Sequence, residues 1–120
     1  MKVLVVEDEP LIRLGLVSLI EEAGYQVLEA ANADAAIRRL EADSSVRVVV
    51  TDVDMPGSMD GIKLAHYVRH RWPPIKLVVL SGKVGVKPEQ LPAGARFMSK
   101  PYQDPQLLRA LETLMSGSSS

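Results

Sequence analysis

Aliphatic runs alternate with helically spaced apolar residues along the whole chain, and this alternation limits the possible fold more than any other feature. Runs of β-branched and aliphatic residues predict strands at 3–6, 25–30, 46–51, 75–80 and 96–99. Helical spacing predicts helices at 11–23, 33–42 and 62–71, and a last helix capped by Asp104-Pro105. The unbroken apolar run at 48–50 is typical of a strand that is covered on both faces.

Strands that alternate with helices favour a parallel sheet with right-handed crossovers and helices on both faces. We therefore expect an α/β fold, a flavodoxin-like doubly wound sheet of five parallel strands in the order 2-1-3-4-5. The segment 82–95 holds three glycines and two prolines. Proline removes a backbone donor and glycine is costly to order, so the fourth helix should be shortened or absent, with at most one turn after Pro88.

Length and composition narrow the class of protein. The chain of 120 residues fits one domain, expected at 1–115 with a flexible tail at 116–120. With 14 Lys+Arg against 15 Asp+Glu, no overall field favours direct binding of nucleic acid. The chain has no cysteine, and the apolar run at 3–6 is too short for a signal peptide or a membrane span. We expect a cytoplasmic domain without a membrane partner.

Polar side chains stand at the ends of four predicted strands. They are Glu7 and Asp8, then Thr51 and Asp52, then Ser81, and finally Lys100. Since ligands of open α/β sheets bind beyond the carboxyl ends of the strands, these side chains should share one edge. Carboxylates as close as Asp8 and Asp52 repel each other unless a cation lies between them, and a few hard oxygen ligands suit Mg²⁺.

The same edge has the parts for phosphoryl transfer. A divalent cation, the ammonium of Lys100 and the hydroxyl of Ser81 can together surround a phosphoryl group, with one aspartate as acceptor or nucleophile. Any one of these residues is commonplace, because an aspartate after a strand is usually a turn former. Their arrival together at four strand ends favours a site. His66 and His70 fit a solvated helix face, and we assign them no chemistry.

Four separated motifs, "VLVVEDEP", "VVVTDVDMPG…DG", "VLSG" and "FMSKPY", resemble the receiver domain of bacterial two-component response regulators. The resemblance covers essentially the whole chain, with the motifs in the family's order. It implies that Asp52 is the phosphoacceptor, which takes phosphate from the phosphohistidine of a histidine kinase or a histidine phosphotransfer protein. It also implies a signalling domain rather than a classical enzyme, which catalyses its own phosphotransfer and slow autodephosphorylation, acts on a downstream protein partner and is a possible homodimer.

The resemblance also implies roles for the other motif residues. Glu7 and Asp8 would organise Mg²⁺, with Asp8, Asp52 and the backbone carbonyl of Asp54 as direct ligands. Ser81 would move onto the phosphoryl group and Lys100 would pair with it. Phe97, for which core packing is otherwise the first expectation, would be the aromatic switch, and Pro101 would follow a peptide bond that is commonly cis.

Two alternatives and two departures accompany this reading. The pair Asp52 and Asp54 also resembles the first motif of haloacid-dehalogenase-type phosphatases, but here an acidic pair precedes it and Lys100 follows. A phosphorylation-independent interaction module is the other alternative, and the intact acidic, hydroxyl and lysine set argues against it. The loop at 55–61 looks one residue longer than the family pattern. The stretch between Ser81 and Lys100 looks shorter, so the family's usual output geometry is not carried over.

Overall fold

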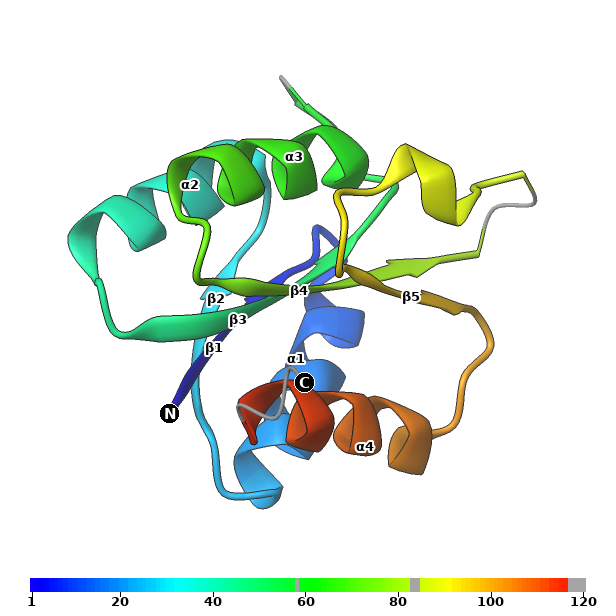
Figure 1. Cartoon of the computed structure of the whole chain (residues 1–120). Coiled ribbons are helices and arrows are strands. Elements are labelled where there is room, and N and C mark those ends of the chain that lie inside the picture. The colour runs from blue at the N-terminus through cyan, green and yellow to red at the C-terminus, as the bar shows by residue number, and fades with distance from the viewer. Residues whose placement is uncertain (58, 83–84, 117–120) are drawn as a thin grey trace.

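The computed structural model describes residues 1–57, 59–82 and 85–116, which form one parallel sheet between two helical layers (Figure 1). The sheet has the order β2-β1-β3-β4-β5, as predicted. The strands are β1 (Lys2–Val6), β2 (Gln26–Ala30), β3 (Val46–Asp52), β4 (Lys76–Ser81) and β5 (Arg96–Ser99). The predicted strands differ from these by at most one residue at either end.

Helices cover both faces of the sheet. They are α1 (Pro10–Glu22), α2 (Ala33–Ala42), α3 (Gly61–Arg71) and α4 (Asp104–Met115). In Figure 1, α2 and α3 lie on one face, and α1 and α4 lie on the other. The two layers follow from the right-handed crossovers that link parallel strands.

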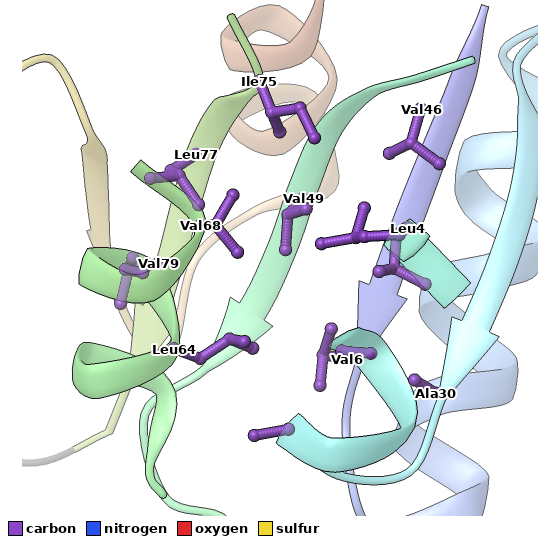
Figure 2. Close-up of a cluster of buried hydrophobic side chains, with 14 of the residues drawn as sticks. Leu4, Val6, Ala30, Val46, Val49, Leu64, Val68, Ile75, Leu77 and Val79 are labelled. Atoms are coloured by element: carbon purple, nitrogen blue, oxygen red, sulfur yellow. The ribbon is translucent and has the colours of Figure 1, made fainter. Parts of the chain in front are cut away.

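The alternation of side chains along the strands divides the core in two. Leu4 and Val6 of β1 point toward α2 and α3, where Leu64 and Val68 complete the cluster that Figure 2 shows. Val3 and Val5 of β1 belong to the other cluster, with apolar residues of α1 and α4. Because both faces of the central strands are covered, these strands are apolar at nearly every position.

The helix starts confirm one predicted cap and correct another. The side chain of Asn32 accepts a hydrogen bond from the amide of Ala35 at 2.8 Å, as expected of a helix cap. The last helix was predicted to be capped by Asp104-Pro105, and this is wrong by one residue, because Asp104 is already helical. Gln103 is the cap, and its amide donates to the side chain of Gln106 at 2.8 Å.

The chain between β4 and β5, residues 82–95, is called the β4–β5 connector below. Its described residues contain only a single 3₁₀ turn, η1 (Pro88–Gln90). The prediction that the helix between the fourth and fifth strands is shortened or absent is therefore confirmed for residues 85–95. Nε2 of His66 lies 2.7 Å from the carbonyl oxygen of Gln90, and Leu91 is buried in the core cluster beside α3. The connector is thus attached to α3 at Gln90 and Leu91.

Two predictions fall partly outside the described residues. Residues 83 and 84 of the β4–β5 connector and residues 117–120 of the expected flexible tail are not described. In the part of the chain that is described, no helix is both long and apolar enough to cross a membrane.

Candidate functional site

Three carboxylates meet where β1 and β3 end. Glu7 and Asp8 follow β1, and Asp52 is the last residue of β3. The two strands are neighbours, with Val6 opposite Thr51, so their ends are side by side. One carboxylate oxygen from each acidic residue lies within 4.8 Å of the other two. The structure therefore brings together the three acidic side chains that the sequence placed at this edge.

Glu7 is the buried member of this acidic cluster. Its side chain is 1% exposed, and Oε2 accepts a hydrogen bond from the amide of Glu9 at 3.1 Å. Oε1 is buried without a hydrogen-bond partner among the described residues. Burial, with smaller contributions from Asp52 and Asp8, raises the pKa of Glu7 to about 7, although Glu9 and Lys100 oppose the shift. A buried, unpartnered carboxylate oxygen in an acidic cluster is a position that favours a cation.

Lys100 supplies the positive charge on the other side of Asp52. Nζ of Lys100 lies 3.2 Å from Oδ1 of Asp52 and 3.9 Å from Oε1 of Glu7. The lysine follows β5, and its amide donates to the carbonyl of Ser81 at 2.8 Å. The next peptide bond, to Pro101, is cis, as the resemblance implied. Strands β3, β4 and β5 thus place Lys100 against Asp52 across 48 residues of sequence.

Ser81 and Phe97 lie on neighbouring strands. Ser81 is the last residue of β4 and is 1% exposed. Phe97 is half-buried in β5 opposite Val79, and it packs against the same core cluster as Val79. Side chains two residues apart in a strand share a face, so Ser81 and Phe97 lie on the side of the sheet that α3 covers.

Asp54 has a different environment from the acidic cluster. Its side chain is exposed in the loop after β3. The group of three carboxylates found among the described residues does not include it. The acidic cluster therefore contains Asp52 but not the side chain of Asp54.

Two further residues, Thr51 and Gly61, support Asp52. Thr51 was expected at this edge without a specific role, and Gly61 was not expected there. Oγ1 of Thr51 donates to the carbonyl oxygen of Asp52 at 2.9 Å. Gly61, the first residue of α3, lies so close to this carbonyl that an added Cβ would be 1.9 Å from its oxygen. The motif "DG" contained the signal for Gly61, because a glycine at a helix start is consistent with close backbone approach.

A family model of the response regulator receiver domain matches residues 3–112 of the chain. The chain belongs to this family. This receiver domain is 32% identical over 117 residues to the response regulator receiver protein CpdR of Brucella abortus, covering 95% of this chain and 96% of CpdR. It is 37% identical over 117 residues to the sensor kinase CckA of the same species, covering 94% of this chain and 12% of CckA. The receiver domain thus corresponds to a small part of that kinase.

A solved structure has the same fold as this receiver domain. The structure of response regulator protein TrrA of Thermotoga maritima, in complex with Mg²⁺ and BeF, is 24% identical, with a TM-score of 0.82, and the match covers 94% of this chain and 97% of TrrA. The family membership makes the protein a signalling domain rather than a classical enzyme, and neither alternative function is favoured. Receiver domains interact with histidine kinases and with downstream effectors.

Proposed function

We propose that Asp52 accepts a phosphoryl group from the phosphohistidine of a histidine kinase or of a histidine phosphotransfer protein. The observation that carries this proposal is the position of Asp52 between the ammonium of Lys100 at 3.2 Å and the carboxylates of Glu7 and Asp8. A carboxylate held between a fixed cation and a second cation site can face an incoming phosphoryl group without strong repulsion.

Mg²⁺ is the proposed cofactor, and the residues present fit it. Glu7, Asp8 and Asp52 offer hard oxygen ligands in small number, and Asp8 is open enough to leave room for water. We assign Asp8, Asp52 and the backbone carbonyl of Asp54 as direct ligands, and Glu7 as the acidic partner that completes the site. When bound, the ion neutralises charge on the phosphoryl oxygens and on the carboxylates.

The chemical step needs a free oxygen on Asp52. Oδ1 already accepts hydrogen bonds from Lys100 and from the amide of Val53, at 3.2 Å and 3.0 Å. We therefore assign the attack to Oδ2, which forms the new P–O bond as the P–N bond of the phosphohistidine breaks and its electron pair stays on the imidazole nitrogen. Lys100 then holds a phosphoryl oxygen. Slow hydrolysis of the acyl phosphate by water would return the receiver to its starting state.

The switch that we propose uses Ser81 and Phe97. Ser81 ends β4 beside Asp52, so a new phosphoryl group attracts its hydroxyl, and Phe97 on the same face rotates into the space that it leaves. A phosphoryl group that makes contacts in one state only shifts the population toward that state. The β4–β5 connector begins directly after Ser81, so it is the element we expect to respond first.

Phosphorylation with a small donor tests the proposal. The protein is incubated with acetyl phosphate, with and without Mg²⁺, and its intact mass is measured over time. We expect a single phosphoryl group that depends on Mg²⁺ and is absent from Asp52→Asn. Phosphorylation of Asp52→Asn at the rate of the parent would refute the assignment of the acceptor. Glu22→Gln, which removes an exposed carboxylate at the end of α1, serves as the control and should be phosphorylated normally.

We also infer the wider setting of the domain from its family. A cytoplasmic location, a receiver domain at 1–115 and a protein partner that reads the phosphorylated state are consistent with the match over residues 3–112. A homodimer is the further possibility that the family allows, and sedimentation with and without phosphorylation would test it. Phosphotransfer from each histidine kinase of the host would identify the natural donor.

A further inference from the structure

The orientation of the peptide group between Glu7 and Asp8 influences the direction of both acidic side chains. It lies beyond the end of β1, because Val6 is the last residue of that strand to pair with β2 and β3. The amide of Glu7 still donates to the carbonyl of Ala30 at 3.1 Å. The carbonyl of Glu7 has left the ladder, so its orientation depends on another donor.

Arg13 of α1 is that donor. One guanidinium nitrogen, Nη1, donates to the carbonyl oxygen of Glu7 at 2.8 Å, and Nε donates to Oε1 of Glu29 in β2 at 3.0 Å. The side chain of Arg13 is 20% exposed. A planar guanidinium that is held at two points has little freedom, so it fixes the carbonyl that it contacts.

The position of Arg13 is not explained by the stability of its helix. The arginine lies at the end of the first turn of α1, and its own amide donates to the carbonyl of Glu9 at 2.9 Å. A positive charge near a helix N-terminus opposes the helix dipole. The two hydrogen bonds, one to the carbonyl of Glu7 and one to the carboxylate of Glu29, offset this penalty and leave the charge beside the acidic edge.

We propose that Arg13 is a positioning residue of the metal site, which holds the Glu7–Asp8 peptide so that both carboxylates face Asp52, and that Glu29 in turn orients Arg13. This inference rests on the proposed Mg²⁺ site and names a residue that serves it without touching the ion. Residues that orient metal ligands contribute substantially to metal affinity even though they lie outside the coordination shell.

The sign of the effect separates positioning from simple electrostatics. Arg13 is a cation close to the acidic cluster, so its charge alone repels a divalent ion. If charge were its only influence, Arg13→Gln would bind Mg²⁺ more tightly than the parent. If Arg13 orients the ligands, the same variant binds Mg²⁺ more weakly.

Mg²⁺ titrations of the whole chain, followed by calorimetry and by the amide chemical shifts of Glu7 and Asp8, test the proposal. We expect Arg13→Gln to raise the Kd for Mg²⁺ about tenfold. Glu29→Gln should raise it by a smaller factor, because Arg13 keeps its contact with Glu7. Arg13→Lys, which retains the charge but has a single donor nitrogen, should recover part of the affinity. Arg38→Gln removes an exposed arginine of α2 and is the matched control.

Thermal unfolding of each variant separates positioning from a structural role. A loss of Mg²⁺ affinity in Arg13→Gln and Glu29→Gln, in samples that are fully folded at the titration temperature, supports the proposal. Unchanged or tighter Mg²⁺ binding by both variants overturns it, as does a lower melting temperature with an unchanged Kd. If Arg13→Gln does not fold, Arg13→Lys decides, because it keeps the charge and a loss of Mg²⁺ affinity in it comes from the changed contacts. A parent protein that binds no Mg²⁺ refutes the proposed metal site itself, and this inference with it.

Discussion

The ammonium nitrogen of Lys100 lies 3.2 Å from Oδ1 of Asp52, and it reaches this position from the strand two places away in the sheet. The pair joins the end of β3 to the residue that follows β5. Because the lysine is 29% exposed and the aspartate 10% exposed, their interaction is only partly screened by solvent.

We predict that Lys100→Ala slows phosphorylation by acetyl phosphate about a hundredfold, because it removes a fixed donor to the phosphoryl oxygens. Mg²⁺ should bind the variant at least as tightly as the parent, since a nearby positive charge is gone. Intact mass measured over time and a Mg²⁺ titration check the two parts. Lys63→Ala, at an exposed position of α3, should match the parent in both. Equal phosphorylation rates for Lys100→Ala and the parent would remove Lys100 from the reaction.

Ser81→Ala should still be phosphorylated but should respond less to the phosphoryl group. The hydroxyl is the group that we expect to move, whereas Asp52 and Lys100 remain in place. Amide chemical shifts of β5 and the β4–β5 connector, recorded with and without phosphorylation, measure the response. Ser99→Ala is the control, because Ser99 is the exposed partner of Ser81 in the pairing of β4 with β5. A full response in Ser81→Ala would separate Ser81 from the switch.

Gly61→Ala and Gly15→Ala should have opposite effects on stability. An added Cβ at Gly61 would be 1.9 Å from the carbonyl oxygen of Asp52, so α3 must shift, at a cost of about 1 to 3 kcal/mol. At Gly15, in the interior of α1, a Cβ meets nothing within 4 Å, and alanine should stabilise the helix by about 0.5 to 1 kcal/mol. Urea denaturation of the two variants provides the measurement. Equal effects would show that the close approach at Gly61 is relieved without displacing α3.

His66→Ala should loosen the β4–β5 connector. A carbonyl oxygen only accepts hydrogen bonds, so the short contact between Nε2 of His66 and Gln90 requires a protonated Nε2. Its removal should speed amide exchange in residues 85–91 with little change in the sheet. His70→Ala, one turn further along the exposed side of α3, should leave the connector unchanged. Identical exchange in both variants would mean that Leu91 alone holds the connector.

Asp43 should add to stability at neutral pH but not in strong acid. The pKa of Asp43 is held well below its usual range, chiefly by the hydrogen bond from Lys2 and then by Ser45. The folded state therefore binds the proton less readily than the unfolded state. The stabilisation is complete above the ordinary value of 3.8 and is lost as the pH falls below it. Denaturation of the parent and of Asp43→Asn should differ at neutral pH and converge in acid, whereas a difference that grows in acid would contradict the assignment.

Features with a local or periodic signature could be predicted from the sequence. The strands and the acidic edge followed from apolar runs that end in polar residues. The loss of a full helix from the β4–β5 connector followed from Pro88 and the nearby glycines. The cap of α4 was misplaced by one residue, because Gln103 is capped through the side chain of Gln106 and carries no strong cap preference of its own.

Contacts between elements were not predictable in the same way. Arg13 reaches Glu29 and His66 reaches Gln90 across 16 and 24 residues, respectively. An arginine or a histidine on an exposed helix face has the same local sequence signature whether or not it has such a partner. The packing of α1 on β2 and of α3 on the connector creates these contacts, so they become visible only once the elements are placed in space.

The attachment of the β4–β5 connector at Gln90 and Leu91 separates two properties that evolution can then change independently. The acceptor chemistry depends on residues at the strand ends, whereas Lys87, Pro88 and Glu89 lie exposed on the connector and take no part in the acidic cluster. Duplicated copies of such a gene could acquire new substitutions at these three positions and so recognise new partners. The phosphorylation reaction would remain intact in each descendant, because none of these three positions belongs to the acidic cluster around Asp52.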